Sequence, residues 1–315
     1  GGEMVVAGLK GNLMGHRACD NENMKRILIV GSGDVARRAL PWLLARFRVF
    51  ALVRRAEQAA ELRAAGAVPI VADLDDRRSL RRLAGLADAV LHFAPPPASG
   101  EVDARTRRLL AALGSARSLA QRLVYISTTG VYGDCRGAWV DETRPCRAQT
   151  ARARRRVDAE RRLRAFARRN RVRLALLRAP GIYAGDRLPL ERLRRGDPVL
   201  SADEDVHTNH IHAEDLAHAA CLALFRARGG RAFNVVDDTG LRMGDYFDLV
   251  ADACGLPRPP RLGREELGRR LSALTLSFMS ESRQLGNSRL KRELRMRLRY
   301  PTVSDGLRTA ELLPD

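Results

Sequence analysis

A short apolar run near the start of this chain ends in a glycine-rich turn, which opens an alternating pattern typical of a helix. Residues 26–36 read Arg-Ile-Leu-Ile-Val-Gly-Ser-Gly-Asp-Val-Ala. Gly31 allows a sharp turn, Gly33 lacks the Cβ that would block a pyrophosphate, and Ala36 lets a helix pack closely on the strand. A helix N-terminus also favours an anion. The pattern predicts a dinucleotide site, although alone it also fits a plain strand-to-helix turn.

Strands and helices alternate regularly after this turn. The hydrophobic pattern predicts strands at 26–30, 47–53, 67–71, 87–93, 122–127 and 172–178. It predicts helices at 34–46, with a kink at Pro41, and at 56–65, 77–84, 102–119 and 151–169. Such alternation favours right-handed crossovers and a parallel sheet that binds ligands at the carboxyl ends of its strands.

We therefore expect an α/β protein: a Rossmann-type doubly wound parallel sheet with a smaller C-terminal substrate lobe. Residues 25–180 are expected to form the dinucleotide-binding domain. Residues 181–315 are expected to form mostly the substrate lobe, with a strand near 232–236 returning to the sheet. Residues 1–24 show no clear period and are expected to be a flexible extension, with Met24 as an alternative start.

The charge of the chain comes almost wholly from arginine. The formal net charge is +19, and the 56 basic residues include only three lysines. The arginines are spread over nearly every predicted helix, and aromatic side chains that would stack on bases are scarce. We therefore expect no specific nucleic-acid partner, and a nucleic-acid-binding role is the third interpretation of the chain.

Cysteine usage and hydropathy indicate the compartment. The five cysteines are scattered without a C-x-x-C pair, so they predict neither a disulfide framework nor a zinc site, and we expect no metal. No apolar stretch reaches the roughly 18 residues of a membrane span, and the chain starts without a signal-peptide pattern. We expect a cytoplasmic monomer or homodimer that acts on a small molecule and has no membrane partner.

Two arginines follow the second predicted strand, where dinucleotide-binding folds recognise the adenosine ribose. An acidic residue at this place suits NAD, whereas a cation suits the 2′-phosphate of NADP. Arg54 and Arg55 therefore favour NADP, with NAD as the alternative. Asp73, after the third strand, either bonds the adenine amine or caps a helix, and Asp34 is either a helix N-cap or a phosphate contact.

Several separated segments resemble one protein superfamily. They read VYISTTGVYG at 124–133, DET at 141–143, RAPGIY at 178–183, NHIHAED at 209–215 and FNV at 233–235. In this order they are similar to motifs of the extended short-chain dehydrogenase/reductase superfamily, in its nucleotide-sugar epimerase and dehydratase branch. The short glycine turn resembles the atypical groups of that superfamily, including the bacterial YeeZ-like proteins. The resemblance implies NAD(P) binding and hydride transfer.

Fingerprint and resemblance together give the expected cofactor-binding residues. The resemblance implies that the strand ending at His92 abuts the nicotinamide ribose. The full expected set is Gly31, Ser32, Gly33, Asp34, Val35, Arg54, Arg55, Asp73, Leu74, Phe93, Ala94, Pro95 and Pro180.

The resemblance also locates a reaction helix. The Tyr-x-x-x-Lys pair of the superfamily precedes an Ala-Glu, and counting back from Ala159 and Glu160 puts Arg152 at the Tyr position and Arg156 at the Lys position. Arginine stays protonated near neutrality, so Arg152 cannot serve as a general acid or base, whereas Arg156 keeps the ribose-holding and electrostatic roles of lysine. Spaced by four, the two either clamp an anion or belong to a solvated basic face.

Four further side chains are candidates for the expected site. Thr128 matches the family hydroxyl that orients the reacting oxygen. Tyr132, Tyr183 and His212 are either acids or bases, or packing side chains, and we expect Tyr132 and His212 to contact the substrate. The expected catalytic residues are Thr128, Arg152 and Arg156.

Two interpretations of the function follow. The first is an NAD(P)-dependent oxidoreductase or epimerase-like enzyme that acts on a small polar carbonyl or hydroxyl compound, such as a nucleotide-sugar. The alternative is a catalytically silent NAD(P)-binding protein that reports the cofactor level to a partner. Thr128 and the later motifs favour the enzyme, and the missing tyrosine favours the sensor.

Overall fold

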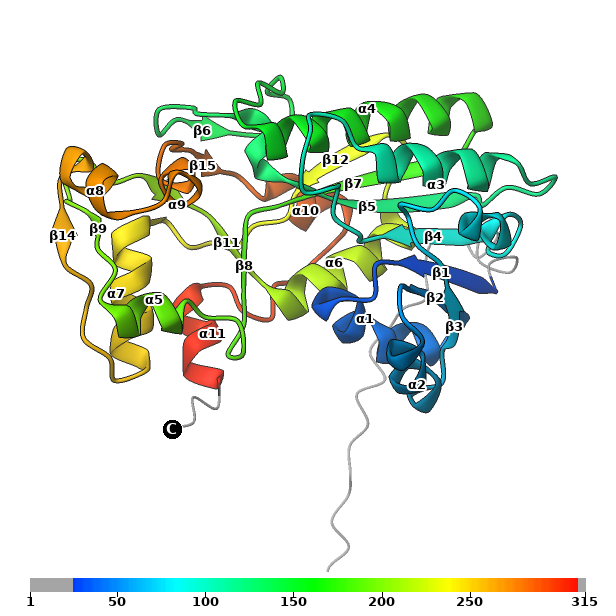
Figure 1. The fold of residues 1–315 in the computed structure, drawn as a ribbon, viewed down its shortest axis with the longest axis horizontal. Coiled ribbons are helices and arrows are strands. Elements are labelled where there is room, and N and C mark those ends of the chain that lie inside the picture. Colours follow the sequence, from blue (N-terminus) through cyan, green and yellow to red (C-terminus); the bar gives the residue numbers. More distant parts are fainter. Residues whose placement is uncertain (1–24, 311–315) are drawn as a thin grey trace, which may run out of the picture.

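A seven-stranded parallel sheet forms the body of the protein in a computed structural model, which describes residues 25–310 (Figure 1). The strand order is β3-β2-β1-β4-β5-β7-β12. The strands are β1 (Arg26–Val30), β2 (Arg48–Val53), β3 (Val68–Val71), β4 (Ala89–His92), β5 (Arg122–Thr128), β7 (Arg173–Ala179) and β12 (Arg231–Asn234). The expected doubly wound α/β fold is confirmed. The order reverses between β1 and β4, and ligands bind at such a switch point.

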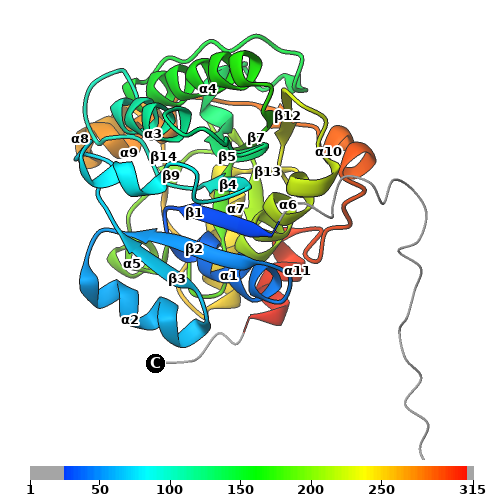
Figure 2. The ribbon, with the colours of Figure 1, turned by 90° about the vertical axis from the view of Figure 1, so that its right-hand side faces the viewer.

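Two layers of helices cover the sheet because successive side chains of a strand point to opposite faces. Ile27 and Ile29 pack into one core with α1 (Asp34–Leu44), α2 (Ala56–Ala65) and α6 (Ala213–Arg226). Leu28 and Val30 pack into the other core with η2 (Ser79–Leu83), α3 (Ala104–Gly114) and α4 (Ala151–Asn170). Figure 2 shows α3 and α4 above the sheet and α1 and α2 below it.

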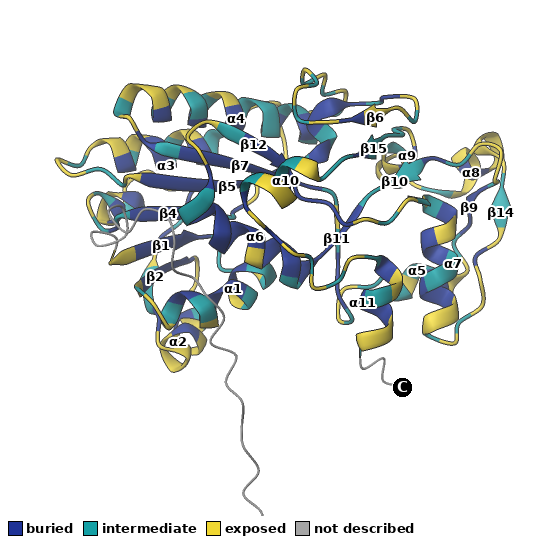
Figure 3. Cartoon of the chain, turned by 180° about the vertical axis from the view of Figure 1, so that it is seen from behind, coloured by how far each residue is buried: buried dark blue, intermediate teal, exposed yellow. Residues whose placement is uncertain are grey.

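A second lobe lies beyond the carboxyl ends of the strands, on the left in Figure 1. Its core joins Tyr183 and Val199 to Phe247 and Leu307, and Figure 3 shows the buried faces of its elements. Its helices are α5 (Leu190–Arg195), α7 (Met243–Ala253), α8 (Arg264–Arg270), α9 (Ala273–Phe278) and α11 (Val303–Thr309). Its strands pair as β8 (Gly181–Tyr183) with β11 (His210–His212), β9 (Val199–Leu200) with β14 (Arg261–Leu262), and β10 (His207–Thr208) with β13 (Leu241–Arg242).

Two connections tie the lobe to the sheet. β6 (Trp139–Val140) pairs with β15 (Gln284–Leu285), and α10 (Ser288–Glu293) follows β15. β12 lies where a returning strand was expected and pairs with β7, with Phe233 opposite Leu177. The sheet therefore receives its last strand from a part of the chain that otherwise builds the lobe.

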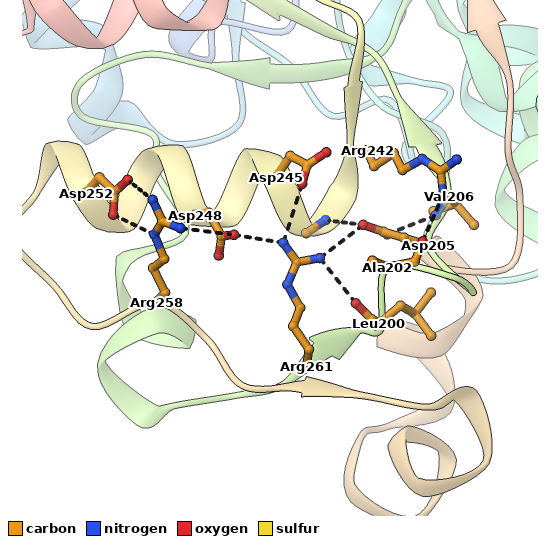
Figure 4. A network of polar contacts seen from close by, with 11 residues as sticks. Leu200, Ala202, Asp205, Val206, Arg242, Asp245, Asp248, Asp252, Arg258 and Arg261 are labelled. Atoms are coloured by element: carbon orange, nitrogen blue, oxygen red, sulfur yellow. Dashed lines mark hydrogen bonds and ion pairs between the residues drawn. The ribbon is translucent and has the colours of Figure 1, made fainter.

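Arg261 holds one side of the lobe together (Figure 4). Its guanidinium donates to Asp248 at 2.8 Å and to the carbonyl of Leu200 at 3.3 Å, and it lies 3.3 Å from Asp205. A Cβ at Gly244 would lie only 1.8 Å from the guanidinium. Glycine at this position therefore leaves room for the Arg261 guanidinium against α7.

Local structure departs from expectation in two helices. The segment expected as a helix at 77–84 forms a 3₁₀ helix over Ser79–Leu83. The helix expected from 102 begins at Ala104, because the Asp103 side chain accepts a hydrogen bond from the Thr106 N–H and caps it. α1 continues through Pro41.

The expected extension at 1–24 lies outside the described residues. Within the described residues, no helix combines the length and apolar character that a bilayer crossing requires.

Candidate dinucleotide and substrate site

The glycine turn joins β1 to α1 at the switch point of the sheet. Gly31 has φ +98°, and a Cβ there would lie 2.5 Å from the backbone nitrogen of Ala94 after β4. The turn thus requires glycine for both conformation and close approach. A Cβ at Gly33 would meet nothing within 4 Å, so open space lies over this residue. Gly33 occupies the cap position of α1 without a side-chain capping bond, leaving a cradle that fits a diphosphate.

Asp34 does not have the N-cap role that the sequence suggested for its side chain, and its contact with a phosphate stays a prediction. Gly33 takes the N-cap position, and the Asp34 carboxylate accepts from Arg38 at 3.0 Å and from Arg187 at 2.9 Å. Burial acts to raise the pKa of Asp34, but the two arginines lower it overall. Asp34 is therefore an anion engaged by two cations, and the N-cap interpretation is wrong.

The end of β2 presents the two arginines expected to select the cofactor. Arg54 and Arg55 are both exposed, and the Arg54 guanidinium lies 3.8 Å from the Asp73 carboxylate. Asp73 uses its other oxygen to accept from the Asp75 N–H at 2.9 Å, so it closes a turn rather than capping a helix. The adjacent Leu74 is buried.

A cavity of about 340 Å³ lies beside the turn, between α1 and α2. Ser32 and Val53 line one end of it, and Arg37 pairs with Glu61 at 3.0 Å along its wall. The Ser32 hydroxyl donates to the Leu52 carbonyl at 2.8 Å. The cavity thus adjoins Ser32, one of the expected cofactor-binding residues.

The end of β4 is bound closely to β1. The N–H groups of Phe93 and Ala94 both donate to the carbonyl of Val30, at 2.7 and 2.9 Å. His92 lies fully buried, 2.8 Å from the Thr106 hydroxyl. Burial and the charge of Arg156 lower the pKa of His92 to about 3, so this side chain is a neutral interior group. Pro95 at this edge is exposed, and Pro180 after β7 is half-buried.

Thr128 ends β5 at the same edge of the sheet and is half-buried. Its hydroxyl oxygen accepts the Gly130 N–H at 3.2 Å and thereby caps η3 (Thr129–Tyr132). A hydroxyl that accepts from the backbone still has its own proton to donate. Thr128 can therefore donate a hydrogen bond to an oxygen placed over the carboxyl edge.

α4 carries Arg152 and Arg156 one turn apart, but their guanidinium groups have different neighbours. Arg156 donates to the Tyr125 hydroxyl at 3.0 Å and to the Ile126 carbonyl at 2.8 Å. Arg152 donates to the Ser277 hydroxyl at 2.8 Å, and its guanidinium lies 3.8 Å from the ring centre of Phe278. Within residues 25–310, neither arginine has a carboxylate at ion-pair distance. Neither charge is thus neutralised by direct ion pairing. Burial lowers the pKa of Arg152, although the charge of Glu281 acts to raise it.

Tyr132 is a packing residue in this structure. It is 1% exposed, donates to Asn234 at 2.7 Å and accepts from Arg178 at 2.9 Å. Burial raises its pKa to about 12, so the neutral phenol persists. Both hydrogen-bonding directions of the hydroxyl are used, which corrects the expected substrate contact.

His212 has a similar structural role. Its Nδ1 accepts the Glu214 N–H and caps α6, and its ring stacks on Tyr300 with the ring centres 3.8 Å apart. Burial lowers the pKa of His212 to about 4, so the ring is neutral near pH 7. In this structure the ring caps and packs, and the expected substrate contact stays a prediction.

Comparison with known proteins agrees with this geometry. A family model described as NAD(P)H-binding matches residues 17–226. The chain belongs to this NAD(P)H-binding family. Solved epimerase structures share its fold, which is therefore an NAD(P)-binding, oxidoreductase- or epimerase-like fold.

Several solved structures are similar to this chain over most of its length. A functionally unknown conserved protein from Silicibacter pomeroyi is 30% identical with a TM-score of 0.73, over 90% of this chain and 97% of that one. UDP-glucose 4-epimerase from Thermotoga maritima has the same TM-score and coverage at 17% identity. UDP-glucuronic acid 4-epimerase from Bacillus cereus, solved with NAD, is 18% identical with a TM-score of 0.70, over 91% of this chain and 97% of that one.

A curated relative matches a shorter part of the chain. A 4-hydroxy-2-methyl-3-oxo-4-farnesyl-3,4-dihydroquinoline-1-oxide ketoreductase from Stigmatella aurantiaca is 36% identical over 132 residues. The match spans 39% of this chain and 39% of that protein.

The sequence did not reveal a buried polar network that holds α4 in place. Arg178 donates to Glu160 at 2.8 Å, both side chains are at least 95% buried, and Ser127 also donates to Glu160 at 2.7 Å. Ion pairing raises the pKa of Arg178 despite the opposing effect of burial. The network joins α4 to β5 and β7 and so fixes the helix that carries Arg152 and Arg156. Arg178 and Glu160 both lie in segments that carry the family resemblance, and neither segment alone indicates that the two side chains pair.

Proposed function

We propose that the protein is an NADP-preferring oxidoreductase that acts on the carbonyl or hydroxyl group of a small polar, anionic compound. The hydroxyl of Thr128 carries the proposal, because its oxygen accepts the Gly130 N–H and its proton remains available to a substrate oxygen at the carboxyl edge. Membership of the NAD(P)H-binding family supports the proposal, because folds of this kind bind dinucleotides at the carboxyl ends of their strands.

The nicotinamide supplies or accepts a hydride at its C4 atom. Thr128 orients the substrate oxygen by hydrogen bonding, and Arg156 places a positive charge beside it. Arg156 is held by the Tyr125 hydroxyl and the Ile126 carbonyl, so its charge costs little reorganisation when a negative charge develops. Neither Arg152 nor Arg156 exchanges protons near neutrality, so in the reduction of a carbonyl the substrate oxygen takes its proton from solvent water.

The two guanidinium groups of α4 support an anionic substrate. Neither has a carboxylate at ion-pair distance within the described residues, and a half-buried arginine without a direct ion-pair partner favours binding of an anion. The curated relative is a ketoreductase by name, which supports a carbonyl group as the reacting centre. Arg54 and Arg55 support NADP, because both are exposed where a 2′-phosphate would lie.

A turnover assay tests the proposal. Wild-type protein with NADPH is offered a panel of ketones, each with and without a carboxylate or phosphate, and NADPH loss and product are both measured. We expect turnover that is faster with the charged member of at least one pair. NADPH binding without turnover of any compound would favour a second function, an NADP sensor. The contact of Arg152 with Ser277 and Phe278 favours that function, because it leaves no titratable group at the family tyrosine position.

A further inference from the structure

A cluster of charged side chains joins the C-terminal lobe to the first turn of α1. Arg38 donates to Asp34 at 3.0 Å, to Asp186 at 2.7 Å and to Glu214 at 3.2 Å. Arg187 donates to the second oxygen of Asp34 at 2.9 Å. Asp186 and Arg187 belong to the loop between β8 and α5, so the lobe contacts the body directly beside the glycine turn.

The two arginines of this cluster differ in how far their charge is compensated. Arg38 contacts carboxylates from three segments, and its side chain is only 16% exposed. Arg187 has Asp34 as its one ion-pair partner among residues 25–310, and its side chain is 35% exposed. Its backbone is fixed, because its N–H donates to the Ala184 carbonyl at 2.9 Å. Arg187 therefore has both the accessibility and the charge to bind a second anion.

The negative charge of Asp34 makes a nearby cation necessary if a diphosphate is to bind beside it. It directly follows Gly33, whose open surface fits the diphosphate of a dinucleotide. A carboxylate in the first turn of α1 would repel that dianion unless a positive charge lay beside it. The Arg187 guanidinium, 2.9 Å from this carboxylate, supplies that charge.

We propose that Arg187, contributed by the C-terminal lobe, binds the diphosphate that NADH and NADPH share. The proposal rests on the dinucleotide site of the proposed function. It assigns different parts of the cofactor to different arginines: Arg54 and Arg55 bind only the 2′-phosphate, and Arg187 binds the common diphosphate. The lobe that covers the substrate thereby also binds the cofactor.

Equilibrium binding separates these roles without an activity assay. NADH, NADPH and adenosine 2′-monophosphate are titrated at about 0.15 M salt into wild-type protein, Arg187→Gln and Arg187→Lys. We expect Arg187→Gln to weaken both dinucleotides about tenfold, since a charge-assisted hydrogen bond is lost. Adenosine 2′-monophosphate, which has no diphosphate, should bind unchanged. Arg187→Lys keeps the charge and should stay within about threefold of wild type for both dinucleotides.

The matched control is Arg195→Gln, which removes an arginine of the same lobe that is paired with one aspartate, Asp197, at 2.7 Å. It should leave all three affinities unchanged. The proposal is overturned if Arg187→Gln binds both dinucleotides like wild type, if it weakens NADPH alone, if Arg195→Gln weakens them equally, or if Arg187→Lys is as weak as Arg187→Gln. Failure of the proposed function looks different, because wild-type protein would then bind neither dinucleotide.

Discussion

At the scale of single residues, charge placement explains how the site would select its ligand. Arg54 and Arg55 are exposed at the end of β2, whereas Arg156 is tied to β5 by the Tyr125 hydroxyl and the Ile126 carbonyl. Arginine is common in this chain, so the sequence position of an arginine says little by itself. The exposure and the contacts of each guanidinium in the folded protein therefore decide which arginines are candidates for ligand binding.

Cofactor preference provides a prediction at this scale. NADPH should bind more tightly than NADH, and the double change Arg54→Asp with Arg55→Ser should weaken NADPH about tenfold or more while changing NADH much less. Fluorescence titration of both cofactors measures this. Arg63→Ser removes an exposed arginine from the far end of α2 and serves as the control. Equal affinities for the two cofactors, before and after the change, would show that the NADP assignment is wrong.

Asp237 gives a prediction about pH. Burial raises its pKa to about 7, its Oδ1 accepts the Thr239 N–H at 2.9 Å, and its Oδ2 has no hydrogen-bond partner among the described residues. The folded state keeps the proton that the unfolded state loses near pH 4, so the free energy of unfolding falls as the pH rises toward 7.

The Asp237→Asn variant removes this titration. Relative to wild type, its free energy of unfolding in urea should rise by on the order of 2 kcal/mol between about pH 5 and pH 7. Asp252→Asn, on the exposed end of α7, should run parallel to wild type. An Asp237→Asn variant that also runs parallel to wild type would mean that the aspartate is ionised in the folded state across this range.

At the scale of elements, α4 is positioned by a buried ion pair as well as by its apolar face. Ala159 and Leu163 pack against the sheet, and Glu160 binds Arg178 in the same interface. Thr150 caps the helix by accepting the Ala153 N–H. The first turn, with Arg152, is thereby fixed next to Thr128 and η3.

Breaking that pair should be costly. Glu160→Gln leaves the Arg178 charge buried without its counter-ion, and we expect the free energy of unfolding to fall by about 3 kcal/mol. Urea denaturation measures the change. Glu265→Gln breaks an exposed pair in α8 and should change stability by less than about 0.5 kcal/mol. A similar small change in Glu160→Gln would contradict the role given to the buried pair.

The sequence predicted those elements whose signal is local. The G-x-G-x-x-A turn, the alternating strands and the arginines after β2 all depend on residues close together in the chain, and the structure has each of these features. The sequence could not show the contacts that Tyr132 and His212 make, because their principal partners are distant in the chain. Asn234 lies 102 residues from Tyr132, and Tyr300 stacks on His212 from beyond α10. The Asp34 and Arg187 contact spans 153 residues and has no local signal.

At the scale of the whole molecule, the excess of arginine is distributed. Many arginines pair with carboxylates on both lobes, including Arg26 with Asp88, Arg105 with Asp75 and Arg258 with Asp252. We expect binding to duplex DNA to be weak and independent of sequence.

Fluorescence anisotropy with two unrelated duplexes tests this expectation. Affinity should be equal for the two and should fall at least tenfold between about 0.05 and 0.2 M salt, because phosphate contacts release counter-ions. Selective binding to one duplex that persists at about 0.2 M salt would contradict a purely distributed charge.

The central claim is that the carboxyl edge of the sheet binds NADPH and that Thr128 orients the oxygen of the reacting group. The most direct test is a single-turnover measurement of NADPH oxidation with an accepted ketone, comparing wild type, Thr128→Ser and Thr128→Val. Thr128→Val should slow the step at least tenfold with NADPH affinity nearly unchanged, and Thr128→Ser, which keeps the hydroxyl, should retain most of the rate. Unchanged oxidation by Thr128→Val, together with its loss in Arg152→Ala, would contradict the account.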